Sequence, residues 1–439
     1  MLSVVASSWA LFLGIALIML GNGLQGSLLG LRASLEGFPT AVTGFVMSAY
    51  FVGFLAGSTL VPRLVRRVGH IRVFAALASL ASATVLLHSV YVTPPSWGAM
   101  RLVTGICFAG LYVVAESWLN DRATNETRGQ LLSVYMVVML AGMGSGHFLL
   151  NLADPASFEL FVLISVLVSL ALIPILLTAA PAPEFQTPSA VSLRQLYRIS
   201  PLGVLGTLGT GMAQGGLVGM GAVFATEAGY SIAQVSIFMA AAMFGGMLLQ
   251  WPIGRLSDRF DRRRVLTVVT FLAAICAIVA SMVAGPFAEI APAWAIFALI
   301  GVFGGMNMPM YSLTIAHTND YLEPSQMVAA SGSLVLVGGI GAAFGPVTLA
   351  GLMSVMGPTG FFWGLGLIHA AIGFFALYRM SKRASRPLDD QGAFVAVPPR
   401  ASPVAAYLSP ESPEAEAAPA ESPEQEGFPE HPEADTLSS

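Results

Sequence analysis

Long apolar stretches alternate with short connections along this chain, and arginines gather in every second connection. A run of about 20 apolar residues is long enough to cross the hydrocarbon core of a bilayer as a helix. The runs are continuous, whereas the strands of a membrane barrel alternate between apolar and polar residues. We therefore predict an all-α membrane protein with twelve transmembrane helices, near residues 6–29, 40–62, 72–92, 97–119, 129–151, 158–178, 199–225, 233–254, 265–284, 292–316, 327–353 and 359–380.

The basic residues orient these helices. Of the 20 Lys and Arg residues, all but Arg32 and Arg101 lie between spans 2 and 3, 4 and 5, 6 and 7, and 8 and 9, or after span 12. Short connections rich in Lys and Arg stay on the cytoplasmic side of a membrane. The pattern predicts a multi-pass membrane protein with both termini in the cytoplasm. Span 1 lacks the features of a cleaved signal peptide and is expected to be retained.

The first half of the sequence is repeated in the second half. Arg67 aligns with Arg259 when the halves are superimposed on their basic connections, and Gly105 aligns with Gly304 at a slightly longer offset. Internal repeats of this kind are typical of transporters. We expect four parts: a six-helix bundle at 1–178, a cytoplasmic connection at 179–198, a second six-helix bundle at 199–383, and a tail at 384–439.

The tail differs from the rest of the chain in composition. From residue 389 onward it holds eleven acidic residues against Arg400 alone, and Pro, Ala, Ser and Glu dominate. Such a segment cannot bury enough apolar surface to fold by itself. We expect a disordered acidic extension, with a docking role as the alternative.

The connections after spans 2 and 8 carry related basic motifs. The second reads Gly254-Arg255-Leu256-Ser257-Asp258-Arg259-Phe260-Asp261-Arg262-Arg263 and resembles G-x-L-x-D-R-x-G-R-R, the cytoplasmic motif of the major facilitator superfamily. The first copy departs from it, with Pro62 for Gly and Arg66 for Asp. The resemblance covers residues 1–383, and the stretch Val113-Val114-Ala115-Glu116-Ser117 is most similar to the YcaD-type bacterial permeases. It implies the two-bundle fold of that superfamily and a cytoplasmic motif formed by Arg67, Gly69, Arg72, Gly254, Arg255, Asp258, Arg259, Arg262 and Arg263.

The same resemblance implies that spans 1, 4, 7 and 10 line a central cavity. Polar groups are costly in a lipid-embedded helix, so each one is a functional candidate. Amides and hydroxyls in such a cavity suit hydrogen bonds to a neutral polar or amphipathic solute. Hydrogen bonds between neighbouring helices are an equally good interpretation. The candidate cavity residues are Asn22, Gln25, Arg101, Phe108, Tyr112, Thr210, Gln214, Asn307 and Tyr311.

Three charged residues are candidates for proton coupling or for gating. Arg101 shares one stripe of span 4 with Glu116. It either presents a fixed positive charge to an anionic group or a proton relay, or reaches out to the membrane surface. Glu116 lies near the cytoplasmic end of span 4, a short connection away from Arg128. An ion pair between these two residues would latch the inner gate; alternatively, Glu116 carries the coupling proton.

Nothing in the sequence indicates an enzyme. It contains no nucleotide-binding loop in the right context, no metal-ligand cluster and no nucleophile triad, and both cysteines, Cys107 and Cys276, fall within spans. We therefore expect no cofactor, no metal and no nucleic-acid partner, and a monomer in the lipid bilayer.

The combined features predict a secondary active transporter that moves a small organic solute by alternating access. Proton coupling is expected, and efflux is slightly favoured over uptake. An uptake permease for a polar metabolite and a non-transporting membrane sensor are the two alternatives.

Overall fold

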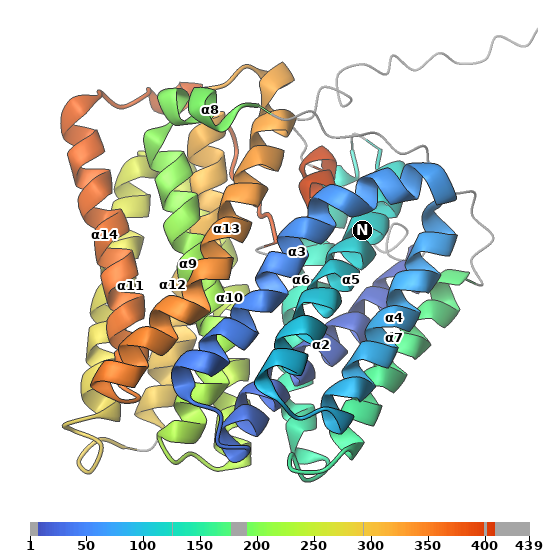
Figure 1. Cartoon of the computed structure of the whole chain (residues 1–439). Coiled ribbons are helices and arrows are strands. Elements are labelled where there is room, and N and C mark those ends of the chain that lie inside the picture. The colour runs from blue at the N-terminus through green and yellow to red at the C-terminus, as the bar shows by residue number, and fades with distance from the viewer. Residues whose placement is uncertain (1–7, 125, 177–190, 293, 399–401, 409–439) are drawn as a thin grey trace, which may run out of the picture.

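A computed structural model describes residues 8–124, 126–176, 191–292, 294–398 and 402–408, and every regular element in these ranges is helical (Figure 1). The first bundle contains α2 (Trp9–Leu35), α3 (Thr40–Val68), α4 (His70–Val90), α5 (Pro94–Asp121), α6 (Arg128–Phe148) and α7 (Glu159–Leu176). The second bundle contains α9 (Pro201–Glu227), α10 (Ile232–Arg259), α11 (Arg262–Ala284), α12 (Ala295–Asn319), α13 (Pro324–Met356) and α14 (Gly360–Lys382). The short elements are α8 (Leu193–Ile199) and three 3-10 turns, η1 (Leu149–Asn151), η2 (Leu388–Asp390) and η3 (Pro403–Leu408).

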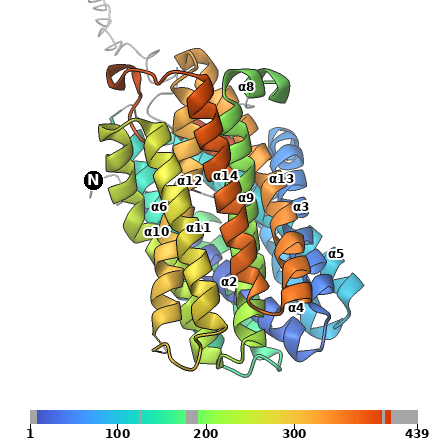
Figure 2. The same cartoon turned by 90° about the vertical axis from the view of Figure 1, so that its left-hand side faces the viewer.

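The two bundles stand side by side, with the second in front of the first when the molecule is turned by 90° (Figure 2). The connections α3–α4 and α10–α11 lie at one end of the molecule together with α8, and we call this the arginine-rich end. The helix α8 begins inside the connection expected at 179–198 and ends one residue beyond it; residues 179–190 lie outside the described residues.

Both bundles use glycine for the same close helix approaches. A Cβ on Gly105 of α5 would lie 2.0 Å from a carbonyl oxygen of α3, and one on Gly304 of α12 would lie 2.2 Å from a carbonyl oxygen of α10. Gly146 of α6 and Gly345 of α13 approach α2 and α9 in the same way, at 2.3 and 2.2 Å. Small residues allow this proximity between membrane helices. The internal repeat of the sequence is therefore also a repeat of packing.

Eleven of the described helices are long and apolar enough to cross a membrane. The helix α9 is not among them, although it has 27 residues and packs against α12, α13 and α14. It contains eight glycines and the polar residues Thr207, Thr210 and Gln214. The expected span at 199–225 thus exists as a helix, but its composition alone does not identify it as a membrane span.

The two bundles are in direct contact at the end opposite the arginine-rich end. A Cβ on Gly44 of α3 would lie 2.4 Å from the side chain of Ala350 on α13, so these helices approach closely. The hydroxyl of Thr40, at the start of α3, donates to Glu227 Oε1, at the end of α9, over 2.6 Å. Two further hydrogen bonds cross from α3 to α13 and from η1 to α10, at 2.6 and 2.9 Å. This end of the interface is closed by the helices themselves.

The tail returns to the helices at the arginine-rich end. Residues 384–398 and 402–408 are described, and η3 contacts α5, α6 and α13. Figure 1 shows η3 in red between the two bundles, near their upper ends. Ser402 and Val404 are buried. These residues differ from the disordered tail that the composition suggests, because they bury their side chains on the bundles rather than on each other. Residues 409–439 lie outside the described residues.

Candidate functional site

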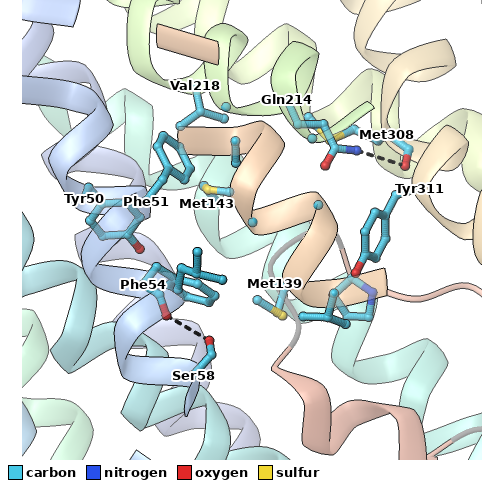
Figure 3. A pocket seen from close by; sticks show the side chains of 18 of the residues that line it. Tyr50, Phe51, Phe54, Ser58, Met139, Met143, Gln214, Val218, Met308 and Tyr311 are labelled. Atoms are coloured by element: carbon cyan, nitrogen blue, oxygen red, sulfur yellow. Dashed lines mark hydrogen bonds between the residues drawn. The ribbon is translucent and has the colours of Figure 1, made fainter. Parts of the chain in front are cut away.

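A cavity lies between the two bundles, with an empty volume of about 910 Å³ that includes space open to solvent. Residues of α3 and α6 form one wall, and residues of α9, α10, α12 and α13 form the other. Figure 3 shows Tyr50 and Phe54 on one side, Met139 and Met143 from α6, and Gln214 and Tyr311 on the other side. The cavity therefore draws its wall from both repeats.

The wall is mostly apolar, with a few polar groups. Besides aromatic rings, the thioethers of Met139, Met143 and Met308 line it. Gln214 Nε2 lies 3.4 Å from the carbonyl oxygen of Met308, and the hydroxyl of Ser58 donates to a backbone carbonyl of its own helix at 2.9 Å. Apolar surface with a small number of placed polar groups is characteristic of small-molecule sites. Methionine side chains adapt to ligands of different shapes.

A buried polar cluster stands behind this wall and reaches the cavity through Tyr50. Asn22 Nδ2 donates to the hydroxyl of Tyr112 at 2.7 Å and to the hydroxyl of Tyr50 at 3.3 Å. The guanidinium carbon of Arg101 lies 4.4 Å from the centre of the Tyr50 ring. A cation above a desolvated aromatic face is attracted by the ring quadrupole. The cluster brings together Asn22, Arg101 and Tyr112, three of the candidates selected from the sequence.

The remaining candidates divide into two groups. Gln214 and Tyr311 line the cavity itself. Gln25, Phe108, Thr210 and Asn307 are buried in the helix packing. Phe108 packs beside Tyr50 and Tyr112, and Asn307 Oδ1 lies 3.2 Å from His369 Nε2. The side-chain polar atoms of Gln25 and the hydroxyl of Thr210 have no hydrogen-bond partner among the described residues.

Of the four spans expected to line the cavity, two do so in the structure. The helices α9 and α12, which are spans 7 and 10, line it, but none of the described lining residues comes from α2 or α5, which are spans 1 and 4. The close glycine approach of α5 to α3 places α3 between α5 and the cavity. Phe54 of α3 covers Tyr112 of α5, with ring centres 5.7 Å apart.

Sequence reasoning missed the face of α3 that carries the cavity wall. Tyr50, Phe54 and Ser58 recur at intervals of four residues, which places them on one side of a helix. This spacing indicates that the three side chains share one face of the helix. It does not show whether that face lines a cavity, packs against another helix or contacts lipid.

Glu116 is buried, and it does not pair with Arg128 among the described residues. The hydroxyl of Tyr135 donates to Glu116 Oε1 at 2.8 Å. The backbone N–H of Ser402 lies 3.0 Å from Oε2, and the hydroxyl of Ser402 donates to the same oxygen. Arg128 Nη1 instead donates to Asn120 Oδ1 at 2.8 Å. The expected latch is therefore wrong in this structure, because Glu116 turns to neutral donors inside the bundle while Arg128 joins the end of α5.

The two copies of the basic motif are used differently. In the first copy, Arg67 and Arg72 are exposed, and Gly69 has φ +92 at the turn between α3 and α4, a conformation that favours glycine. In the second copy, Arg262 is buried and its Nη1 lies 2.5 Å from Asp320 Oδ1. The second copy alone therefore has a buried ion pair among the described residues.

The other basic residues of the second copy lie around this ion pair. Arg255 stacks on the ring of Trp251 at 3.7 Å, and Arg259 is exposed. Arg263 Nη2 lies 3.2 Å from Asp261 Oδ2, and its Nη1 donates to the carbonyl oxygen of Arg383 at 2.8 Å. These contacts hold the start of α11 against the end of α14.

Asp320 follows the last residue of α12, and its environment shifts its ionisation. Burial raises the pKa of the Asp320 carboxyl above its ordinary value, and the positive charge of Arg262 acts in the opposite direction. Gly392 of the tail also donates its N–H to Asp320 Oδ1 at 3.2 Å. The carboxyl of Asp320 therefore depends on Arg262 to remain charged while buried.

Known proteins match this chain over most of its length. The chain is 28% identical over 378 residues to the uncharacterized MFS-type transporter YcaD of Salmonella arizonae, covering 86% of this chain and 95% of that protein. The YcaD protein of Escherichia fergusonii is 28% identical over 342 residues, covering 77% of this chain and 87% of that protein.

Solved transporter structures share the fold. The nucleoside transporter NupG superimposes with a TM-score of 0.69 at 13% identity, covering 85% of this chain and 99% of that chain. A bacterial homolog of the human lysosomal transporter Spinster, in an inward-facing and occupied conformation, superimposes with a TM-score of 0.66 at 15% identity, covering 88% and 98%. The family model of the Major Facilitator Superfamily matches residues 11–319 and 203–410. With two repeated helical bundles around one cavity, and with these matches, the chain belongs to the Major Facilitator Superfamily of transporters.

Proposed function

We propose that the protein is a proton-coupled secondary transporter that expels a small organic solute across the bacterial inner membrane by alternating access. The arginine-rich end lies in the cytoplasm in this proposal, because basic connections remain on that side. Both termini are then cytoplasmic, and α9 is the twelfth span despite its glycines.

One observation carries the proposal: the cavity is walled by both repeats and closed by direct helix contacts at the end away from the arginines. Transporters of this architecture rock one bundle against the other around a site between them. Separation of α3 from α13 and of α2 from α9 would open the cavity outward. The arrangement described here is then the inward-directed state of the cycle.

The wall of the cavity supports a solute with an apolar or aromatic body and few polar groups. Tyr50, Phe54 and the methionines offer apolar contact, while Gln214 and Tyr311 offer hydrogen bonds. Asn22 and Arg101 contact the hydroxyl and the ring of Tyr50, and Tyr112 is linked to Tyr50 through Asn22, which donates to both hydroxyls. We infer that these three residues orient Tyr50 toward the solute.

A bulky residue at Gly339 is expected to abolish solute binding and transport. Gly339 lines the cavity, and the nearest side-chain atom to a Cβ there is 3.3 Å away, on Leu55. Gly339→Trp fills the space that the solute needs. Gly351→Trp is the matched control on the same helix, because Gly351 is exposed and a Cβ there has no neighbour within 4 Å.

The measurement starts with a thermal-shift screen of the purified protein against metabolites and drugs. A compound that stabilises the native protein is then assayed for counterflow in proteoliposomes. Gly339→Trp should lose both the thermal shift and the counterflow, and Gly351→Trp should keep them. Equal activity of the two variants would remove the cavity from consideration as the transport site.

Proton coupling is proposed to depend on Glu116. Glu116→Gln keeps the size of the side chain but cannot bind and release a proton, so solute movement driven by a pH gradient should stop. Exchange of labelled for unlabelled solute needs no net protonation change and should continue. If flux driven by the pH gradient is unchanged in Glu116→Gln, Glu116 does not carry the coupling proton. Arg101 and its surroundings are then the next candidate.

A further inference from the structure

The described part of the tail binds both bundles at the arginine-rich end. On the second bundle, the carbonyl oxygen of Gly392 accepts from Arg262 Nη2 at 2.6 Å, and its N–H donates to Asp320. Gln391 Oε1 accepts from the backbone N–H of Arg262 at 3.3 Å. The buried ion pair of the motif therefore also serves as a receptor for the tail backbone.

The next residues of the tail are held by the start of the same motif. The backbone N–H of Phe394 donates to Asp258 Oδ1 at 2.7 Å. The ring of Phe394 lies against Gly254, where a Cβ would be only 2.5 Å from the ring. Further along, the N–H of Val397 donates to the hydroxyl of Ser312 on α12 at 3.0 Å. Glycine at 254 and aspartate at 258 thus fit the tail in shape and in hydrogen bonding.

On the first bundle, the tail binds through Ser402. Its N–H and its hydroxyl both donate to Glu116, which also accepts from Tyr135. Ser402 is completely buried, and Val404 and Ala405 beside it are buried too. Without the tail, the hydroxyl of Tyr135 would be the remaining side-chain donor to the Glu116 carboxylate in the part of the chain that the structure describes. The tail therefore supplies most of the hydrogen bonds that the buried carboxyl group of Glu116 makes in the part of the chain that the structure describes.

These attachments place the tail across the inner end of the cavity. Pro398 lines the cavity itself, next to residues of α12 and α13. The helices close the opposite end, as the contacts of Gly44 and Thr40 show. The tail thus occupies the side from which the cavity would otherwise be reached.

We propose that the docked tail, residues 386–398 and 402–408, is an intramolecular plug that closes the cytoplasmic mouth of the cavity and must leave before a solute can enter or depart on that side. The composition of the segment fits this role. Residues 391–408 contain no Asp or Glu, so the segment brings no like charge to Asp258, Asp320 or Glu116. The effect of the plug on flux rests on the proposed transport function, whereas closure of the cavity can be tested without it.

Cavity access can be measured with a single cysteine at Ser58, which lines the cavity on α3. The reporter Ser58→Cys is placed in a background in which the two native cysteines are replaced, Cys107→Ala and Cys276→Ala. A membrane-impermeant maleimide is added to inside-out vesicles, and the labelling rate is measured by mass spectrometry. Three chains are compared: the full chain, the chain lacking residues 388–439, and the chain lacking residues 409–439.

The chain lacking 388–439 should label at least about tenfold faster than the full chain, because several hydrogen bonds to charged groups no longer hold the mouth closed. The chain lacking 409–439 keeps every docked residue and should label at the full-chain rate. Ser402→Asp in the full chain sets a second carboxylate against Glu116, and it should accelerate labelling without removing any residue. Thermal unfolding and size-exclusion chromatography establish that each variant is folded.

Equal labelling of folded chains with and without residues 388–439 would overturn the plug. If the longer deletion does not fold, Ser402→Asp decides, and an unchanged labelling rate of that variant likewise overturns it. Faster labelling in a protein that moves no solute would support the plug and count against the proposed transport function. Faster labelling together with faster counterflow would support both.

Discussion

Replacement of Arg262 by Met is expected to cost about 3–5 kcal/mol of folding free energy, because it leaves a buried carboxylate without its counter-charge. The side chains of Arg262 and Asp320 are only 2% and 4% exposed, and they lie 2.5 Å apart. The double variant Arg262→Met/Asp320→Asn removes the orphaned charge and should recover most of the loss. Thermal unfolding in detergent, followed by tryptophan fluorescence, measures the three proteins.

The deficit of Arg262→Met should also depend on pH. Burial already raises the pKa of Asp320, and loss of the opposing Arg262 charge raises it further. A carboxyl whose folded pKa exceeds its unfolded pKa contributes stability below the unfolded value and loses it as pH rises through the folded value. The difference in unfolding temperature between Arg262→Met and the native protein should therefore narrow as the pH falls from about 8 to about 5.

One control separates the ion pair from the tail that it binds. The same substitution is made in the chain lacking residues 388–439, where Gly392 can no longer contact Arg262. If Arg262→Met lowers the unfolding temperature strongly and in a pH-dependent way in both the full and the shortened chain, the loss of stability is due to the unpaired Asp320. A deficit that disappears in the shortened chain, or one that grows toward low pH, would contradict the expectation.

An added methyl group at Gly105 is the second change with a large expected effect. In Gly105→Ala the new Cβ would have to lie 2.0 Å from the carbonyl oxygen of Tyr50, so α5 and α3 must move apart. Overpacking of this kind costs about 1–3 kcal/mol, and more where backbone rather than a flexible side chain is in the way. The unfolding temperature in detergent should fall clearly, and Gly304→Ala should have a similar effect on the second bundle.

Gly98→Ala is the matched control for Gly105→Ala. Gly98 lies on the same helix, and a Cβ there meets nothing within 4 Å. Alanine at that position should leave the unfolding temperature unchanged or raise it slightly, because glycine is the poorer helix former. Similar unfolding of the Gly98→Ala and Gly105→Ala proteins would show that the α3–α5 contact is looser than described.

Much of the architecture could be predicted from the sequence because lipid imposes simple rules on it. Helical length and hydropathy indicate the span positions, and the alignment of Gly105 with Gly304 anticipates equivalent helix contacts. The helical spacing of residues in span 4 places Tyr112 among the candidates, and in the structure its hydroxyl accepts a hydrogen bond from Asn22. These predictions concern residues whose helical phase decides what they face.

The cavity wall and the partner of Glu116 could not be predicted in the same way. Whether α3 or α5 lines the cavity depends on how closely the two helices pack. The glycine contact between them sets α5 behind α3, so that Tyr50 and Phe54 of α3 form the cavity wall. Opposite charges close in sequence favour a pair between Glu116 and Arg128. A neutral donor 286 residues away along the chain, Ser402, has no counterpart in local sequence.

The docked tail escapes prediction for a different reason. Averaged from residue 389 onward, the segment is acidic and rich in proline, yet residues 391–408 hold no acidic residue and include Phe394, Val397 and Val404. A shorter window separates this apolar stretch from the acidic one that begins at Glu411. Even so, composition says only that the stretch can bind apolar surface, and the bundles determine where.

The glycines of α9 have a consequence for how the protein is made. A helix enters the bilayer from the ribosome-bound translocation channel according to its own hydropathy, and α9 is the described bundle helix that is not among the eleven candidate spans. Its glycines are instead matched to the backbone of α13, with Gly211 against Gly338 and Gly215 against Ala342. Since α10, α11 and α12 are synthesised before α13, the contacts that these glycines make become available only after most of the second bundle has emerged. Biogenesis of this half is therefore expected to be cooperative rather than helix by helix.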